Sequence, residues 1–259
     1  MKVISWNVNS IRTRLERVAG LLQRHRPDLL CVQETKVSDE HFPAAELAAL
    51  GYRSEAYGRG GYNGVALLSR EPLSRVERGF AGDPAADQAR VIAGDLGSLR
   101  VVNLYVVNGE SVGSDKFRLK LDWLDRLAAW LAAEHRPGEP LLLVGDFNIA
   151  PEDRDVHDPE LWRGKNLVSE PERERLRALL GWGLVDLLRR QTGAAGLFTW
   201  WDYRMGAFHR GWGLRIDLAL GTEPVARRLR SVEIDRQERK PTAGPGKPSD
   251  HAPLVVTLE

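Results

Sequence analysis

Residues 141–148 read LLLVGDFN, an apolar run that passes directly into Gly145, Asp146 and Asn148. A short apolar run that ends in a turn signal is typical of a strand in the core of a sheet. Side chains two residues apart on an extended chain point to the same side. We therefore expect Asp146 and Asn148 to lie side by side at the end of a buried strand.

The same arrangement recurs at four other apolar runs along the chain. Each of these runs borders a carboxylate, a carboxamide or an imidazole, and the residues concerned are Asn7, Asn9, Glu34, Asp217, Asp250 and His251. A single Asp or Asn beside a strand is usually a turn former or a cap, so none of them is informative alone. Asp217 is harder to explain in that way, because it interrupts the apolar segment 214–220 and needs a partner there.

Together these residues suit a hard divalent cation. Mg²⁺ takes oxygen ligands, and it commonly combines a few protein carboxylates with waters and substrate phosphate. Zinc would require more His or Cys ligands than this set offers. The set therefore predicts a site of the magnesium type, assembled from several strand ends.

The chain alternates between strand-like and helix-like patterns, with strands in the majority. Short runs rich in Val, Ile and Leu predict strands at residues 3–6, 29–33, 65–69, 90–93, 99–107, 141–144, 184–188, 198–201, 216–220, 232–234 and 254–258. Apolar residues at helical spacing predict helices over 11–22 and 117–131, and start signals predict two more at Ser169 and Thr222. This count favours an α/β fold with two mostly antiparallel sheets packed face to face and helices outside, in place of a barrel of alternating strands and helices. No domain boundary is visible, so residues 1–259 are expected to form a single domain.

The composition excludes several classes of protein. The chain has 259 residues, of which 42% are hydrophobic and 28% are charged, and its formal net charge is +1. These values exclude a disordered chain and a uniformly basic nucleic-acid binder, although charge sorted onto one face would still allow a DNA partner. A single cysteine, Cys31, excludes an internal disulfide framework and a cysteine-rich zinc site.

Neither a leader nor a membrane segment is recognisable. Met1 and Lys2 run into a short strand-like segment without the longer apolar stretch and cleavage site of a signal peptide. No stretch approaches the roughly 18 consecutive apolar residues of a membrane span. We expect a soluble, cytoplasmic protein with no membrane partner.

Eight segments, taken in order, resemble the exonuclease III family of apurinic/apyrimidinic endonucleases, which has the endonuclease/exonuclease/phosphatase fold. They are WNVNSIR (6–12), LLCVQETK (29–36), GYNGVALLSR (61–70), LYVVNG (104–109), LVGDFNIAPEDRDVHDP (143–159), TWWDYR (199–204), GLRIDLAL (213–220) and KPSDHAPL (247–254). The resemblance covers essentially the whole chain, and the third segment, together with the block formed by the sixth and seventh, makes it specific. One departure is Val107, where many relatives carry Pro.

The resemblance implies a four-layer α/β sandwich and cleavage of DNA phosphodiesters that depends on Mg²⁺, with Mn²⁺ able to substitute. It implies that Glu34 holds the metal, with help from Asn7 and Asp250. Asp146 and Asn148 would lie beside the attacking water and the phosphate, and together with His251 they would line a second metal site if there is one.

The same resemblance assigns the remaining catalytic roles. His251 would be oriented by Asp217, and Tyr105 would approach the phosphate. An Asp–His pair fixes the imidazole tautomer and supports its charged form. The sequence leaves open whether Asp146 or His251 removes the proton of the attacking water.

The resemblance also implies a substrate-binding surface for double-stranded DNA, especially DNA that is abasic or blocked at its 3′ end. Trp200 and Leu214, with Trp212 adjacent, would form an apolar pocket for a deoxyribose that lacks its base. The other candidate contacts are Asn9, Arg12, Arg14, Tyr62, Asn63, Arg90, Asn108, Lys116, Arg118 and Arg204. Arg90 could equally be the buried partner of an acid. A monomer is the simpler expectation for the oligomeric state.

Three functions are thus to be compared. The first is a DNA-repair nuclease with abasic-site endonuclease, 3′→5′ exonuclease and 3′-phosphatase activity. The second is an enzyme of the same fold acting on another phosphoester, such as an inositol phosphate or a phospholipid head group. The third is a DNA-binding module or scaffold without catalysis, which the complete set of candidate catalytic residues disfavours.

Overall fold

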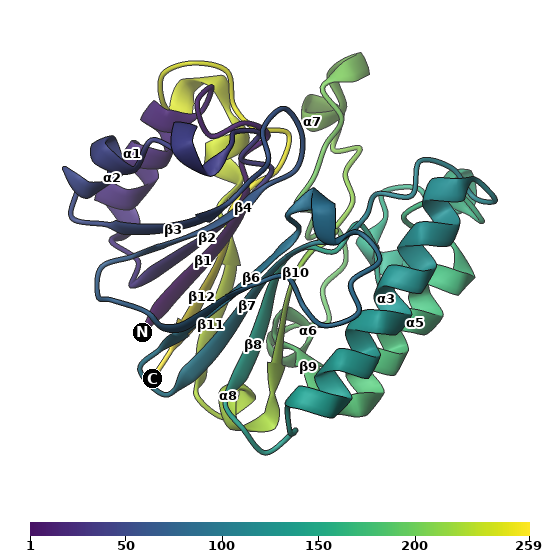
Figure 1. Cartoon of the computed structure of the whole chain (residues 1–259). Helices are drawn as coiled ribbons and strands as arrows, with labels where there is room; N and C mark the ends of the chain where they lie inside the picture. The colour runs from purple at the N-terminus through teal and green to yellow at the C-terminus, as the bar shows by residue number, and fades with distance from the viewer.

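Two six-stranded sheets face each other in the computed structural model, which describes residues 1–259 (Figure 1). In spatial order, the first sheet consists of β11 (Leu229–Ile234), β12 (Leu254–Leu258), β1 (Lys2–Asn7), β2 (Leu29–Gln33), β4 (Val65–Ser69) and β3 (Arg53–Tyr57). The second consists of β5 (Ser74–Arg78), β6 (Val91–Leu96), β7 (Leu99–Tyr105), β8 (Leu141–Asp146), β10 (Asp217–Thr222) and β9 (Leu184–Asp186).

Each sheet contains one parallel pair, and its other pairs are antiparallel. The parallel pairs are β1 with β2 and β7 with β8. Parallel neighbours need a crossover connection, and here the helices α1 (Leu15–His25) and α3 (Asp115–Glu134) supply it. Two sheets that are mostly antiparallel were expected from the sequence, and the structure confirms them.

Helices cover the outer face of each sheet, so the molecule has four layers (Figure 1). α1 and α2 (Ala44–Ala48) lie on the first sheet, while α3 and α5 (Glu170–Trp182) run side by side on the second. Trp123 of α3 belongs to the same buried cluster as Leu143 of β8, and Leu21 of α1 packs with Ile4 of β1. The predicted four-layer α/β sandwich is confirmed.

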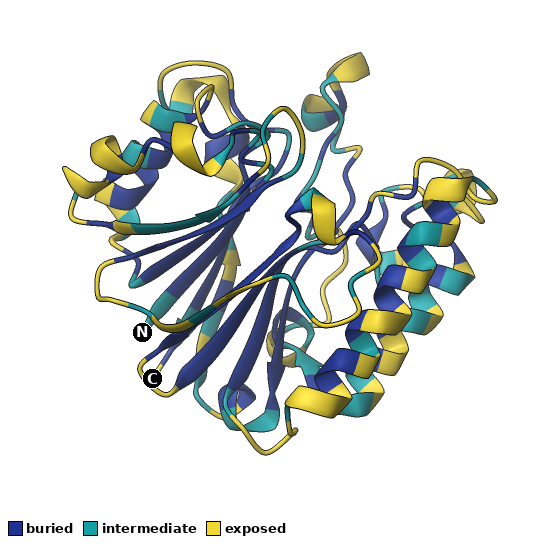
Figure 2. Ribbon diagram, in the orientation of Figure 1, coloured by how far each residue is buried: buried dark blue, intermediate teal, exposed yellow.

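The central strands are buried on both faces, as the dark blue ribbons of Figure 2 show. Between the sheets, Cys31 and Leu67 of the first sheet pack in one cluster with Val101 and Val144 of the second. Strands buried on both sides read as continuous apolar runs. This is why the sequence pattern located the central strands.

Helix starts follow the capping signals. Ser169 and Glu172 form the predicted capping box at the start of α5, and α8 (Glu223–Ala226) follows Thr222. The first helix begins at Leu15, four residues later than its apolar spacing predicts, because residues 11–14 form a turn. The remaining helical segments are short: η1 (Asp39–His41), η2 (Ala86–Gln88), η3 (Asp153–Asp155), α4 (Pro159–Trp162), α6 (Leu187–Gln191), η4 (Arg204–Gly206), α7 (Ala207–Arg210), η5 (Arg236–Arg239) and η6 (Pro241–Ala243).

Two strands escaped sequence analysis because they lie at sheet edges. β3 (RSEAY) and β5 (SRVER) each pair on one side only, and most of their side chains are at least partly exposed. Edge strands carry charged residues that discourage pairing with other chains. They therefore lack the apolar run by which the central strands were found.

Two predicted strands were wrong in whole or in part. Residues 198–201 form no strand, and Trp200 makes only isolated bridges to Leu214 and His251. The segment predicted as a strand over 184–188 changes to a helix after Asp186, because the Asp186 carboxylate accepts the backbone N–H groups of Leu188 and Arg189 and caps α6.

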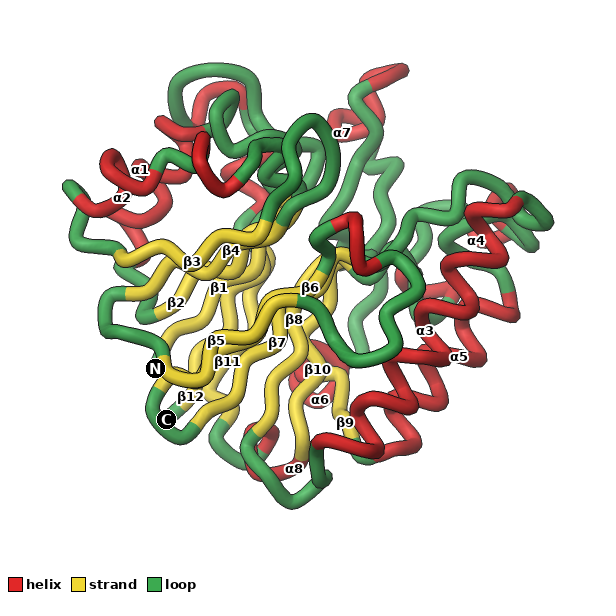
Figure 3. The backbone as a smooth tube through the Cα atoms, in the orientation of Figure 1, coloured by secondary structure: helices red, strands yellow, loops and turns green.

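Long connections gather at one end of both sheets, drawn as green tubes above the strands in Figure 3. This is the end at which β1, β2, β7 and β8 finish and at which β10 and β12 begin. No helix in the structure is both long and apolar enough to cross a membrane.

Candidate active site

Strand register assembles the centre of the candidate site. Tyr105 lies opposite Asp146 across β7 and β8, and Asp146 lies opposite Asp217 across β8 and β10. Asn7 ends β1 in the facing sheet, next to the final residue of β2. Residues from both sheets therefore meet at the same end of the sandwich.

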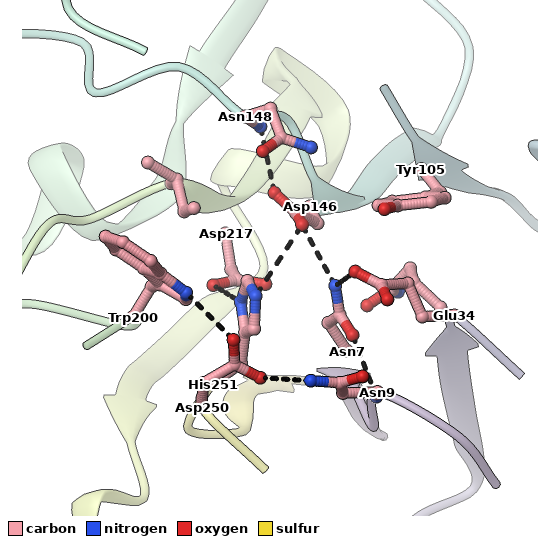
Figure 4. Close-up of polar contacts among 12 residues, drawn as sticks. Asn7, Asn9, Glu34, Tyr105, Asp146, Asn148, Trp200, Asp217, Asp250 and His251 are labelled. Carbon is pink, nitrogen blue, oxygen red and sulfur yellow. Dashed lines mark hydrogen bonds and ion pairs between the residues drawn. The ribbon is translucent and has the colours of Figure 1, made fainter. Parts of the chain in front are cut away.

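Asp146 accepts hydrogen bonds from two sides (Figure 4). The Asn7 Nδ2 atom donates to Asp146 Oδ2 at 3.0 Å and to Glu34 Oε1 at 2.9 Å. The backbone N–H of Asn148 donates to Asp146 Oδ1 at 2.9 Å, as in a turn closed by an Asp side chain. The Asn7 amide thus links the two carboxylates that the sequence placed in the metal site.

Four candidate site residues have left-handed backbone conformations, and they are Asn9, Glu34, Asn63 and Asn148. Glu34 has φ 53° and Asn148 has φ 52°. Such conformations are costly for a residue with a β-carbon, and they persist only where the surrounding structure holds them. The turn after β2 directs the Glu34 carboxylate toward Asn7, and the turn after β8 places the Asn148 side chain against the Asn108 amide, which donates to Asn148 Oδ1 at 2.9 Å.

His251 lies between two carboxylates. Its Nδ1 atom is 2.9 Å from Asp217 Oδ2, and its Nε2 atom is 3.8 Å from Asp146 Oδ2. Burial lowers the pKa of His251, but the Asp217 and Asp146 carboxylates outweigh burial and raise it to about 10. The imidazole is therefore a buried cation at neutral pH when no metal is bound.

Both oxygens of Asp250 accept hydrogen bonds from residues outside the Glu34, Asp146 and His251 group. Its Oδ1 atom accepts the Asn9 amide at 2.9 Å, and its Oδ2 atom accepts the Trp200 indole N–H at 3.1 Å. Burial raises the pKa of Asp250, but His251 and these two donors outweigh it and hold the pKa below its usual range. Asp250 thus connects the turn after β1 to Trp200.

The residues that could hold a cation are Glu34, Asp146 and His251, whose ligand atoms lie within 4.8 Å of one another. Burial raises the pKa of Glu34, but the Lys36 ammonium at 2.8 Å and the Asn7 amide outweigh it and lower the pKa. Burial and the neighbouring carboxylates raise the pKa of Asp146 to about 7. The ionised Glu34 carboxylate and the Asp146 carboxylate, which loses its proton near neutrality, together fit a hard divalent cation. His251 would not be a ligand while it is protonated.

Tyr105 and Arg90 form the edge of the site on the second sheet. The Arg90 guanidinium stacks over the Tyr105 ring with 4.8 Å between its central carbon and the ring centroid. It also donates to the Asn63 side-chain oxygen at 3.1 Å. Burial and nearby acids raise the pKa of Tyr105 well above its usual value, so its hydroxyl is a hydrogen-bond donor at neutral pH. Arg90 forms no salt bridge with an acid; it is buried and also donates to the Gln88 side chain at 2.8 Å and to the Tyr105 carbonyl at 3.1 Å.

The other predicted DNA contacts divide by exposure. Arg12, Tyr62, Asn108, Lys116, Arg118 and Arg204 are exposed on loops or at helix starts, and Asn9 and Asn63 are partly buried and hydrogen-bonded to neighbours. Arg14 is buried instead. Its guanidinium donates to the Asn9 carbonyl at 2.6 Å and to the Tyr203 hydroxyl at 2.7 Å, so in this structure it holds the turn after β1 in place.

Only some of the residues predicted to form the apolar pocket line a cavity in the structure. Leu214 is fully buried and forms a β-bridge with Trp200 through the backbone. Its side chain therefore does not line the pocket. Trp200 and Trp212 both line a cavity of about 500 Å³. Two of the three residues therefore share an accessible pocket.

Sequence analysis missed the ion pair of Lys120 and Glu172, which is fully buried between α3 and α5. The Lys120 ammonium also donates to the carbonyls of Asn148 at 2.7 Å and Asn108 at 3.1 Å. Lys120 thus fixes the backbone of two candidate site residues. The signal was a Lys three residues after Phe117, on the buried face of an amphipathic helix.

Comparison with known proteins places this geometry in a family. The model of the endonuclease/exonuclease/phosphatase family matches residues 4–251. The chain belongs to this family. The resemblance to its exonuclease III members is confirmed as well, since the chain is 36% identical to exodeoxyribonuclease III of Haemophilus influenzae over 98% of both proteins.

Solved structures of endonuclease/exonuclease/phosphatase proteins agree. NExo from Neisseria, a 3′ phosphatase solved with a product DNA hairpin, is 40% identical, with a TM-score of 0.93 over 100% of this chain and 99% of that chain. An AP endonuclease from Archaeoglobus fulgidus is 37% identical, with a TM-score of 0.94 over 100% of this chain and 99% of its own. These relatives favour a nuclease over an enzyme for inositol phosphates or phospholipid head groups.

Proposed function

We propose that the chain is a metal-dependent DNA-repair nuclease of the exonuclease III type. It incises duplex DNA 5′ to abasic sites and removes nucleotides or phosphate from 3′ ends. The proposal rests on one observation, that two groups of residues meet where the two sheets face each other. The first group is Asn7 with Glu34 and Asp146, and the second is the Asp217–His251 pair. The similarity to an exodeoxyribonuclease, a 3′ phosphatase and an AP endonuclease supports the choice of DNA as substrate.

Glu34 and Asp146, bridged by Asn7, would hold the cation, which we propose is Mg²⁺ with Mn²⁺ as a substitute. When bound, such a cation offsets the charge of the phosphodiester and stabilises the oxygen that leaves. Asp250 is proposed to act indirectly, because both its oxygens already accept hydrogen bonds from Asn9 and Trp200.

The protein side chains divide the remaining work. Water attacks phosphorus and the P–O3′ bond breaks, which leaves a 3′-hydroxyl on the retained strand and the phosphate on the departing group. Asp146 is proposed to take the proton of the attacking water. The His251 cation and the Tyr105 hydroxyl are placed to donate to phosphate oxygens, and Asp217 keeps His251 charged and oriented. Asn148 is proposed to orient the water and the phosphate.

The activity test is incision of a duplex that carries one abasic analogue. We expect incision 5′ to the analogue with Mg²⁺ and none with EDTA, and we expect an undamaged duplex to be shortened only from its 3′ ends. A matched assay with an inositol phosphate tests the other substrate class. No incision with Mg²⁺, or equal incision in EDTA, would contradict the proposal.

Cation binding is expected to strengthen about tenfold from about pH 6 to about pH 8, because the cation must displace a proton from Asp146. The pKa of Asp146 is about 7 in the metal-free protein, so its carboxyl is mostly protonated at the lower pH and mostly ionised at the higher. Calorimetric titration with Mn²⁺ in two buffers of different ionisation enthalpy measures both the affinity and the proton released. An affinity that is independent of pH would show that Asp146 is already ionised.

We also propose an oligomeric state and a cellular compartment for the protein. All candidate site residues come from one chain and from both sheets, which supports a monomer in which residues 1–259 form one catalytic domain. Cys31 is a buried free thiol, which fits the reducing cytoplasm that we propose as its compartment.

A further inference from the structure

A layer of buried polar side chains lies between the two sheets, next to the candidate active site, and is used by none of the steps above. This amide layer consists of Gln33 on β2 and Asn103 on β7, together with the Ser5 hydroxyl on β1. All three side chains are fully buried. Burying an amide is costly unless its polar atoms are hydrogen-bonded, so the partners of these side chains indicate what the layer does.

The amide layer separates the apolar core from the site. Side chains two residues apart on a strand face the same side of a sheet. On β7, Asn103 therefore stands between Val101, which belongs to the core between the sheets, and Tyr105 of the site. On β2, Gln33 is the last residue and directly precedes Glu34. The amides thus lie where the core ends and the site begins.

Hydrogen bonds of the amide layer join the two sheets. The Gln33 Nε2 atom donates to Asn103 Oδ1 at 2.7 Å and to Ser5 Oγ at 3.0 Å. The Asn103 Nδ2 atom donates to the backbone carbonyls of Val32 and Ala66, both at 3.0 Å. β2 and β4, which carry these two carbonyls, face β7 across the core (Figure 1). Asn103 therefore ties β7 of the second sheet to two adjacent strands of the first.

These bonds differ in kind from the other contacts between the sheets. No strand of one sheet is paired with a strand of the other, and the core cluster between them consists of apolar side chains such as Leu67 and Val144. The attraction between apolar surfaces has no preferred direction, whereas a hydrogen bond weakens steeply when its geometry changes. The amide layer therefore opposes sliding of one sheet over the other close to the site.

We propose that Gln33 and Asn103 are positioning residues that set the distance between the two sides of the cation site. This inference rests on the proposed function, in which Glu34 from the first sheet and Asp146 from the second hold one cation. Glu34 directly follows Gln33, and Asp146 lies opposite Tyr105, two residues beyond Asn103. A shift of β7 against β2 therefore moves one ligand relative to the other, and Mg²⁺ tolerates little change in the geometry of its ligands.

The test replaces the amides by apolar side chains of similar size. Gln33→Met and Asn103→Leu are each expected to weaken Mn²⁺ binding about tenfold, as loss of a residue that orients metal ligands commonly does. The double variant is expected to bind Mn²⁺ little more weakly than the weaker single variant, because both changes remove the same contact. Calorimetric titration measures these affinities at one pH. DNA affinity in EDTA, measured by fluorescence anisotropy, is expected to stay unchanged.

The matched control is Thr222→Val, which removes a buried hydroxyl at the far end of β10 from the site. The Thr222 hydroxyl donates to the Glu139 carbonyl at 2.6 Å and accepts the backbone N–H of Leu141 at 3.1 Å, so its loss lowers stability without touching the amide layer. Urea unfolding is expected to show a lower midpoint for this variant, with Mn²⁺ affinity unchanged. Mn²⁺ binding that weakens as much as in Gln33→Met would show that lost stability alone disturbs the site, and it would overturn the proposal.

Ser5→Ala is a milder variant that serves if either amide replacement fails to fold. It removes only the hydroxyl that accepts from Gln33, and it is expected to weaken Mn²⁺ binding about threefold. Unchanged Mn²⁺ affinity in the folded variants, or losses that add in the double variant, would overturn the positioning role. The affinities are measured without DNA, so an unaltered protein that binds Mn²⁺ but cuts no DNA contradicts the proposed function alone.

Discussion

The Asp146→Asn variant is expected to bind abasic duplex DNA and to cut it about 100- to 10,000-fold more slowly than the unaltered protein. The carboxamide has nearly the shape of the carboxylate, but only its oxygen accepts, so it keeps one of the two hydrogen bonds that come from the Asn7 amide and the backbone N–H of Asn148. It can neither take a proton from water nor supply negative charge to a cation. Single-turnover incision measures the chemical step, and fluorescence anisotropy in EDTA measures DNA binding.

The matched control is Asp122→Asn, the same change at an exposed carboxylate on α3 that pairs only with Arg126. It is expected to leave both measurements unchanged. Turnover that survives in Asp146→Asn would remove Asp146 from the catalytic group. Parallel loss of turnover and DNA binding would mean that Asp146 positions the substrate and takes no part in the chemistry.

The Lys120→Met variant is expected to lose about 3–5 kcal/mol in its free energy of unfolding, because it leaves the Glu172 carboxylate buried without its partner. Its turnover is expected to fall about tenfold with DNA affinity retained, since the carbonyls of Asn148 and Asn108 lose their donor. Urea unfolding, single-turnover rate and DNA affinity separate these effects.

The double variant Lys120→Met, Glu172→Gln distinguishes support of the site from general stability. Removing the second charge is expected to recover part of the unfolding free energy, because the new carboxamide oxygen can still accept a backbone N–H group from Leu167 or Ser169. Turnover should stay low, since the two carbonyls remain without the ammonium. Turnover that recovers in step with stability would show that the pair is structural only.

An element could be predicted from the sequence where residues that are close together in the chain determine it. The central strands and the polar residues at their ends could be predicted, because a strand buried on both faces is an apolar run and its end is marked by a change of residue type. The edge strands β3 and β5 could not, since they carry the charged residues of an exposed edge. The segment 198–201 has strand-like composition, but its aromatic residues pack in an irregular segment.

Residue types and their short-range spacing were enough to establish the fold class, the family resemblance and the identity of the residues that end the strands. Which of those side chains meet, and in which protonation state, became visible only in the folded molecule. The pKa of His251 is raised because it lies between Asp217 and Asp146, and the pKa of Asp146 is raised because it is buried near Asp217 and Glu34. A pKa depends on burial and on distances between charges, and here the register of strands far apart in the chain sets both. The Lys120–Glu172 pair and the pocket that His157, Trp162 and Trp212 line likewise join distant segments, so a local pattern cannot show which of these residues meet.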